Sequence, residues 1–177
     1  GVVNEERIAD EEESLTEREQ MTEQQMVGAR EMYNHMKGHF GEVKGGNMTV
    51  WPTDLVQTKV GDMAGENGIQ KISEALHKSG QLDEMRKDPF LVIDLKSAAD
   101  KFIAAGGDKD ATVYEVLFRD LAMAEMPESV GNQGDFDKLT DMQGYQDREV
   151  QSGAAGKLYE FKQANPDKYN EYLGNFI

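Results

Sequence analysis

Cysteine is absent from the 177 residues of this chain. Without thiols, the protein has no disulfide framework, and zinc-thiolate sites, iron–sulfur clusters and thiol nucleophiles are excluded as well. This one absence removes several classes of enzyme. The length fits a single domain, or a small core with a helical extension.

Basic residues are scarce, at 19 Lys and Arg against 34 Asp and Glu, and the formal net charge is −15. Binding to nucleic acid or to an anionic membrane depends on clustered positive charge, so we expect no direct nucleic-acid partner and no membrane partner. Long apolar runs are missing too. The longest, Phe90–Ile93, ends at Asp94, whereas a membrane-spanning helix needs about 20 apolar residues. We expect a soluble protein with protein partners, and we favour a location in the cytoplasm or within a larger particle.

The N-terminal part of the chain combines acidic charge with helical periodicity. The first 25 residues carry nine Asp and Glu against two Arg. Apolar residues then recur at spacings of three and four, the period of an α-helix. These residues are Met26, Ala29, Tyr33, Met36 and Phe40. The pattern predicts a long acidic helical arm over residues 1–44.

The apolar stripe of this arm is the predicted interaction surface, with Met26, Tyr33, Met36 and Phe40 buried against protein. One helical stripe serves equally well to pack on the body of the same chain or on a second copy. Both possibilities stay open at the level of sequence. Self-association through the N-terminal helix is therefore one expected mode of assembly.

The remainder of the chain is punctuated as a series of helices. Glycines cluster ahead of Pro52 and predict a break at residues 41–54. Farther along, Thr112 and Glu115 have the spacing of a capping box at a helix start. No segment shows sustained alternation of apolar and polar residues. We predict an all-α fold, an irregular bundle of about six or seven helices, with a compact body at residues 54–177.

Two histidines have a spacing that metal ligands use. His35 and His39 are four residues apart, so on a helix both imidazoles face the same side. The residues between them are Met-Lys-Gly, without the Glu base of zinc proteases. We predict neither a metal nor a cofactor, and keep this pair as a weak alternative metal site.

The segment that opens with Asp108 has part of the spacing of a calcium-binding loop. Asp108, Asp110 and Thr112 alternate as the first calcium ligands do. However, Val113 stands where such a loop needs glycine, and Arg119 stands where it needs a bidentate Glu. We therefore interpret this segment as a turn and a helix cap.

An enzymatic interpretation centres on two glutamates. Glu125 and Glu128 lie at the end of an apolar helical segment, and Ser129 follows directly. Downstream, a run of small residues at 152–156 leads into Leu-Tyr-Glu-Phe at 158–161. This arrangement resembles that of the lytic transglycosylases, in which a helix ends in a catalytic Glu followed by Ser, and a later small-residue turn precedes a stretch that lines the sugar groove. The resemblance implies that Glu125 or Glu128 protonates the glycosidic oxygen as a general acid.

No motif in the sequence fixes a reaction. We therefore predict a non-enzymatic structural, assembly or protein-interaction component of a larger complex, of the kind found in phage virions or secretion apparatus. Two alternatives remain open. One is a lytic transglycosylase-like enzyme that cleaves cell-wall glycan with Glu125 or Glu128, and the other is a secreted effector that acts by binding protein.

Overall fold

The computed structural model of the chain describes residues 20–176. Within this range the protein is helical and has no strand, which confirms the predicted all-α class. The described residues form more and shorter helical segments than the six or seven predicted. The acidic run at residues 1–19 lies outside them, so the predicted helix is described only from its second part onward.

Most of the helices in the described residues are short, and one segment, Val116–Asp120, is π-helical. In chain order the elements are α2 (Glu23–Phe40), the 3₁₀ turn η1 (Met48–Val50), α3 (Thr53–Val56), α4 (Val60–Met63), α5 (Gly68–Lys78), α6 (Leu82–Lys87), α7 (Leu91–Ala104), α8 (Val113–Glu115), the π-helical segment η2 (Val116–Asp120), α9 (Leu121–Glu125), α10 (Gln133–Gln143), α11 (Arg148–Ala164) and α12 (Pro166–Asn175). Among residues 20–176, no helix has the length and apolar character needed to cross a membrane.

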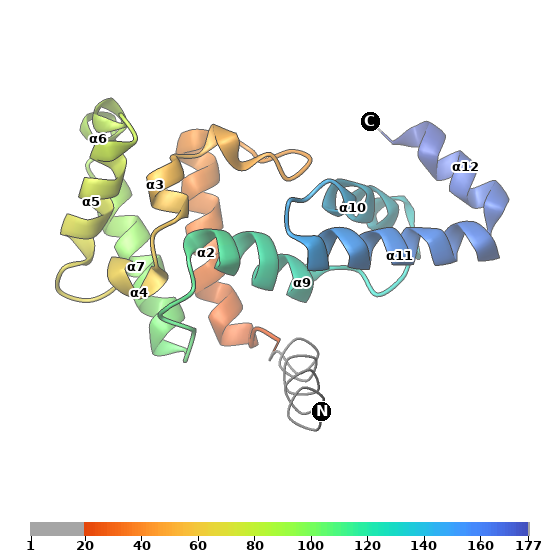
Figure 1. Cartoon of the computed structure of the whole chain (residues 1–177), viewed down its shortest axis with the longest axis horizontal. Helices are drawn as coiled ribbons and strands as arrows, with labels where there is room; N and C mark the ends of the chain where they lie inside the picture. Colours follow the sequence, from red (N-terminus) through yellow and green to blue (C-terminus); the bar gives the residue numbers. More distant parts are fainter. Residues whose placement is uncertain (1–19, 177) are drawn as a thin grey trace, which may run out of the picture.

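Helices α2 and α7 pack side by side at the centre of the larger part of the molecule (Figure 1). Gln25, near the start of α2, donates from Nε2 to the carbonyl oxygen of Ala105, just past the end of α7, at 3.3 Å. At the opposite ends of the two helices, His39 Nε2 lies 3.0 Å from Asp88 Oδ2. The two helices are therefore antiparallel.

The start of α8 follows the local capping chemistry that the sequence predicts. The Thr112 hydroxyl accepts from the Glu115 backbone N–H, and the Glu115 carboxylate accepts from the Thr112 N–H, both at 3.1 Å. This reciprocal pair satisfies two donors that the first turn of a helix leaves unpaired. The predicted capping box is confirmed.

Buried apolar side chains form two separate clusters. The larger one joins α2 to α7, α8 and η2, and it also contains side chains from the segment between α2 and α3, which the sequence marked as a break. From that segment Val43, Met48 and Trp51 are all buried. The smaller cluster lies between α10, α11 and α12, with Phe136 in contact with Phe161. Helix α2 is thus part of the larger cluster.

A glycine turn ties the two clusters together. The N–H of Gly45 donates to Asp141 Oδ1 of α10 at 2.6 Å. Gly45 and Gly46 both have positive φ, at 59° and 66°, a conformation that glycine adopts without steric cost. A Cβ on Gly46 would stand 2.5 Å from the Cα of Tyr145. The turn after α2 therefore docks against the corner between α10 and α11 (Figure 1).

Candidate functional site

The predicted interaction stripe on α2 packs against the body of its own chain. Met26 and Met36 are buried in the larger cluster, and Tyr33 and Phe40 are half-buried against it. Two of the four side chains are therefore buried and two are half-buried, and the protein that covers them is the chain itself. An additional partner of α2 must therefore contact its outer faces.

A crevice of about 320 Å³ opens where α2, the helix containing η2 and α9, and α10 meet. It lies at the junction of the two hydrophobic clusters, since Leu121 belongs to the larger one and Ala122 to the smaller one. Apolar and polar side chains share the lining. The apolar residues are Leu117, Leu121, Ala122 and Met142, and the polar residues are Arg30, Tyr33, Asn34, Glu125, Lys138 and Tyr145.

Glu125 is the central charged group of the crevice. Its Oε1 accepts from Arg30 Nε at 2.8 Å, and its Oε2 lies 3.7 Å from Lys138 Nζ. Each carboxylate oxygen therefore faces a cation, one from α2 and one from α10. A general acid must carry a proton on one oxygen and direct it at the substrate. The arrangement around Glu125 instead holds two cations beside a carboxylate.

The second glutamate of the enzymatic interpretation lies elsewhere. Glu128 is exposed in the segment after α9 and does not line the crevice. Its backbone carbonyl accepts from Lys157 Nζ at 3.0 Å. The structure thus brings Glu125 into the crevice and leaves Glu128 outside it.

Two tyrosines line the crevice. Burial raises the pKa of Tyr33 and of Tyr145, and the nearby carboxylates of Asp141 and Glu125 raise both further. Removing the phenolic proton would place a negative charge in a partly buried site that already contains carboxylates. Both phenols therefore keep their protons near neutral pH.

The wall of the crevice contains the π-helical segment η2, which no pattern in the sequence predicts. Such segments are rare, and those that do occur are frequently found at functional sites. Here Leu117 lines the crevice, whereas the next residue, Phe118, is buried. The ring of Phe118 packs against four other aromatic rings, at centroid distances of 5.1 to 6.4 Å. These are Tyr33, Trp51, Tyr114 and Tyr145.

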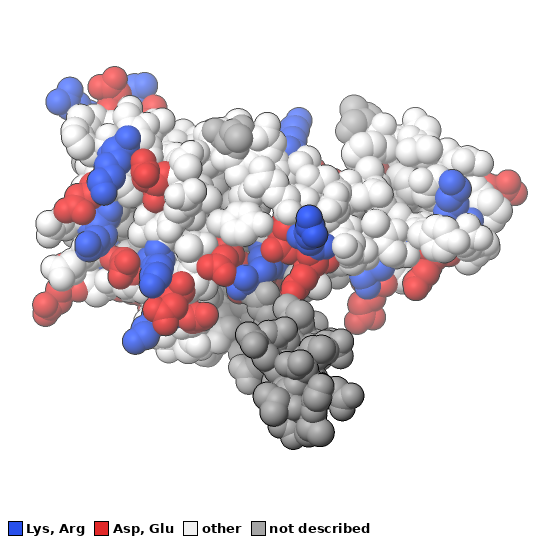
Figure 2. Space-filling view, viewed as in Figure 1, with Lys and Arg blue, Asp and Glu red and all other residues white. Residues whose placement is uncertain are grey.

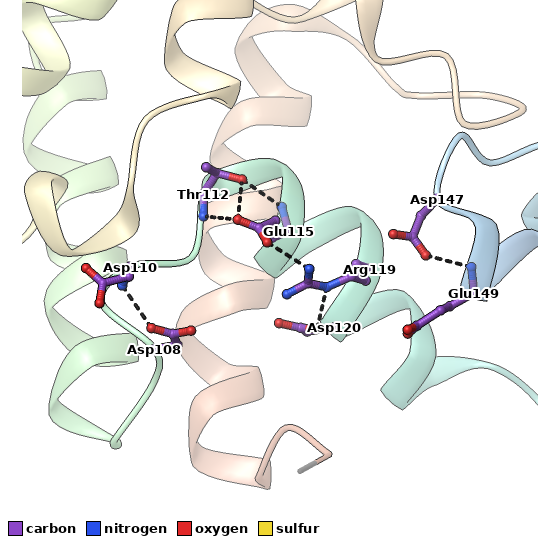
Figure 3. A network of polar contacts seen from close by, with 8 residues as sticks. All are labelled: Asp108, Asp110, Thr112, Glu115, Arg119, Asp120, Asp147 and Glu149. Atoms are coloured by element: carbon purple, nitrogen blue, oxygen red, sulfur yellow. Dashed lines mark hydrogen bonds and ion pairs between the residues drawn. The ribbon is translucent and has the colours of Figure 1, made fainter. Parts of the chain in front are cut away.

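The segment with partial calcium-loop spacing forms a turn and a helix start, as interpreted from the sequence (Figure 3). The N–H of Asp110 donates to Asp108 Oδ1 at 2.9 Å. One turn into the helix, Arg119 bridges Glu115 and Asp120, at 2.7 and 3.1 Å. These side chains stabilise the start of the helix that carries η2.

One carboxylate lies beside the histidine pair of α2. His39 pairs with Asp88, and His35 is half-buried one turn earlier. Within the part of the chain that the structure describes, no three His, Asp or Glu side chains gather closely enough to hold a metal ion.

No family model matches the chain, and neither curated proteins nor solved structures gave a match. The function must therefore be inferred from the site itself.

Proposed function

We propose that this protein is a non-enzymatic interaction component of a larger assembly, and that it contacts its partner at the crevice. The observation that carries this proposal is the position of Glu125, held between Arg30 and Lys138 beside an apolar wall. Charged groups that neutralise one another at the mouth of an apolar crevice are suited to recognition. They are poorly suited to delivering a proton.

The size and place of the crevice support a binding role. Ligand pockets span roughly 300 to 1,000 Å³ and occur preferentially between packed units of a protein. At about 320 Å³, the crevice accepts one or two inserted side chains. Its walls come from both hydrophobic clusters, so an inserted segment would contact both at once.

The ion pairs of the crevice are inexpensive to rearrange. The side chains of Arg30 and Lys138 are 47% and 43% exposed. Ion pairs at such positions contribute about 0 to 1 kcal/mol, because water and salt screen them. A partner can therefore replace one member of the network without a large loss of stability.

A glycan-cleaving enzyme is the second candidate, because Glu125 lines the crevice together with Tyr33 and Tyr145. This alternative requires Glu125 to release its two cations and take up a proton when substrate binds. The secreted-effector alternative uses the same contact site and differs from the main proposal in the place where the partner resides.

Site-specific photo-cross-linking tests the proposal. A benzophenone side chain placed at Asn34, an exposed residue of the crevice, should form one discrete adduct in cells of the source organism. The same group at Glu74, exposed on α5, is the positional control and should form none. The adduct should weaken on Arg30→Gln and persist on Lys101→Gln, because Lys101 pairs with Glu31 away from the crevice.

A glycan-release assay tests the enzymatic alternative on the same full chain. The interaction proposal predicts no soluble fragments from purified cell-wall glycan. Fragment release that Glu125→Gln abolishes, with the thermal melting temperature unchanged, would overturn the proposal in favour of the enzyme.

A further inference from the structure

We propose that the crevice is selective for a carboxylate. The partner inserts an acidic side chain, and this side chain replaces Glu125 between Arg30 and Lys138. An aliphatic or aromatic side chain flanks the acidic one. This inference depends on the proposed function, because it assigns the chemistry of the partner at the same site. The partner itself is a peptide segment.

Hydrogen-bond donors outnumber acceptors in the lining. A guanidinium group offers five N–H donors and an ammonium group offers three, and Arg30 uses its Nε–H on Glu125. Tyr33 and Tyr145 also line the crevice, and their phenols keep the protons that they can donate. Glu125 is the single carboxylate among the residues that line the crevice. A ligand with negatively charged acceptor oxygens complements this surplus.

Two carboxylates near the crevice do not reverse this balance. Asp141 and Glu42 are close enough to raise the pKa of Tyr33, after the larger effect of burial. Neither lines the crevice, and Asp141 already accepts from the N–H of Gly45 at 2.6 Å. A basic partner would therefore find one lining carboxylate, Glu125, with both oxygens facing cations.

The strongly acidic composition of the chain is also compatible with an acidic partner. At physiological salt, interactions between exposed charges are screened beyond about 8 Å. Figure 2 shows acidic and basic side chains interleaved over the described part of the drawn face. The sign of the charge that a ligand must carry is therefore set more by the groups inside the crevice than by the net charge of the chain.

The apolar wall sets the second requirement for the partner. Leu117, Leu121 and Met142 line the crevice together with the two cations. The flexible thioether of Met142 adapts to side chains of different shape. An acidic residue next to leucine or phenylalanine would satisfy both halves of the site.

Three capped tripeptides provide the test: acetyl-Leu-Glu-Leu-amide, and the versions with Gln or Lys at the centre. Each is titrated into the full chain at 0.15 M salt, on the order of physiological ionic strength. Binding is followed by amide NMR shifts and by the fluorescence of Trp51. That residue is the single tryptophan of the chain, and its ring centroid lies 5.5 Å from that of Tyr33.

The Glu peptide should bind at least about fivefold more tightly than the other two, because it alone forms hydrogen bonds in which the acceptor is charged as well as the donor. Arg30→Gln should reduce its affinity to the level of the Gln peptide. Lys101→Gln, which removes a cation outside the crevice, is the matched control and should leave the affinity unchanged. Equal melting temperatures of the variants would show that folding is intact.

The outcomes separate this inference from the proposed function. Equal binding of the three peptides, or preference for the Lys peptide, would overturn the carboxylate assignment and leave the interaction role standing. If none of the three peptides binds but the cross-link from position 34 is retained, the carboxylate assignment is likewise overturned and the interaction role stands. Failure of the peptides together with loss of the cross-link would overturn both.

Discussion

Gly28 of α2 lies directly against the backbone of Phe102 in α7. A Cβ at position 28 would stand 2.7 Å from the Phe102 nitrogen and 3.0 Å from the Ala98 carbonyl oxygen. The two helices therefore approach each other more closely than any side chain at this position would permit. This contact fixes the inner face of α2 on the body of the chain.

Gly28→Ala should destabilise the protein by about 1 to 3 kcal/mol, because an added methyl group meets backbone atoms that cannot move aside. Gly38→Ala is the matched control on the same helix. No atom lies within 4 Å of a Cβ at position 38, and alanine is favoured over glycine in helices by about 0.5 to 1 kcal/mol. Urea unfolding should show opposite signs for the two substitutions, and equal effects would contradict the close packing of α2 on α7.

The turn that joins the two hydrophobic clusters should respond differently at its two glycines. Gly45→Ala meets only the strain of a positive φ, since nothing lies within 4 Å of a Cβ there. Gly46→Ala meets the same strain and also the Cα of Tyr145 at 2.5 Å. The second substitution should therefore cost at least about 1 kcal/mol more than the first in urea unfolding. Equal costs would mean that the turn is not docked on the corner between α10 and α11.

Stability should fall in alkaline solution because of the buried tyrosines. Burial and nearby carboxylates raise the pKa of Tyr145 above the ordinary value of 10.0, and Tyr33 and Tyr114 shift in the same direction. The folded state then binds the phenolic protons more tightly than the unfolded state. Their contribution is complete below about pH 10 and is lost as the pH rises through the folded pKa values.

Unfolding free energies measured from about pH 9 to about pH 11.5 check this dependence, because this range covers the titration of an ordinary phenol. The wild-type protein should lose stability with pH, and Tyr145→Phe should lose it less steeply because one titrating group is gone. Tyr159→Phe, at a side chain that is 64% exposed, should follow the wild-type slope. A Tyr145→Phe slope identical to the wild-type slope would contradict the burial of this phenol.

Helices could be predicted from the sequence because their determinants lie close together along the chain. The capping box needs only Thr112 and Glu115, and the stripe on α2 needs only apolar residues at helical spacing. Which protein covers the stripe is a tertiary property, and it depends on Gly28 meeting a helix some 70 residues away in sequence. The stripe alone therefore could not distinguish packing on α7 from packing on a second copy.

The crevice could not be predicted for the same reason. Arg30, Glu125 and Lys138 come from three helices, and no local pattern relates them. The place of Glu125 at a helix end is visible in the sequence, whereas no local pattern marks the two cations beside it. The π-helical segment could not be predicted from the sequence either, because the apolar spacing of Val116, Leu117 and Leu121 also suits a regular α-helix.

The affinity of Glu125→Gln for the acetyl-Leu-Glu-Leu-amide peptide tests the central claim most directly. Removing the charge of Glu125 frees Arg30 and Lys138, so the full-length variant should bind this peptide up to about fivefold more tightly than the wild-type protein. The variant should still release no fragments from cell-wall glycan. Weaker binding by the variant would contradict this account of the crevice, as would a wild-type glycan-cleaving activity that the substitution abolishes.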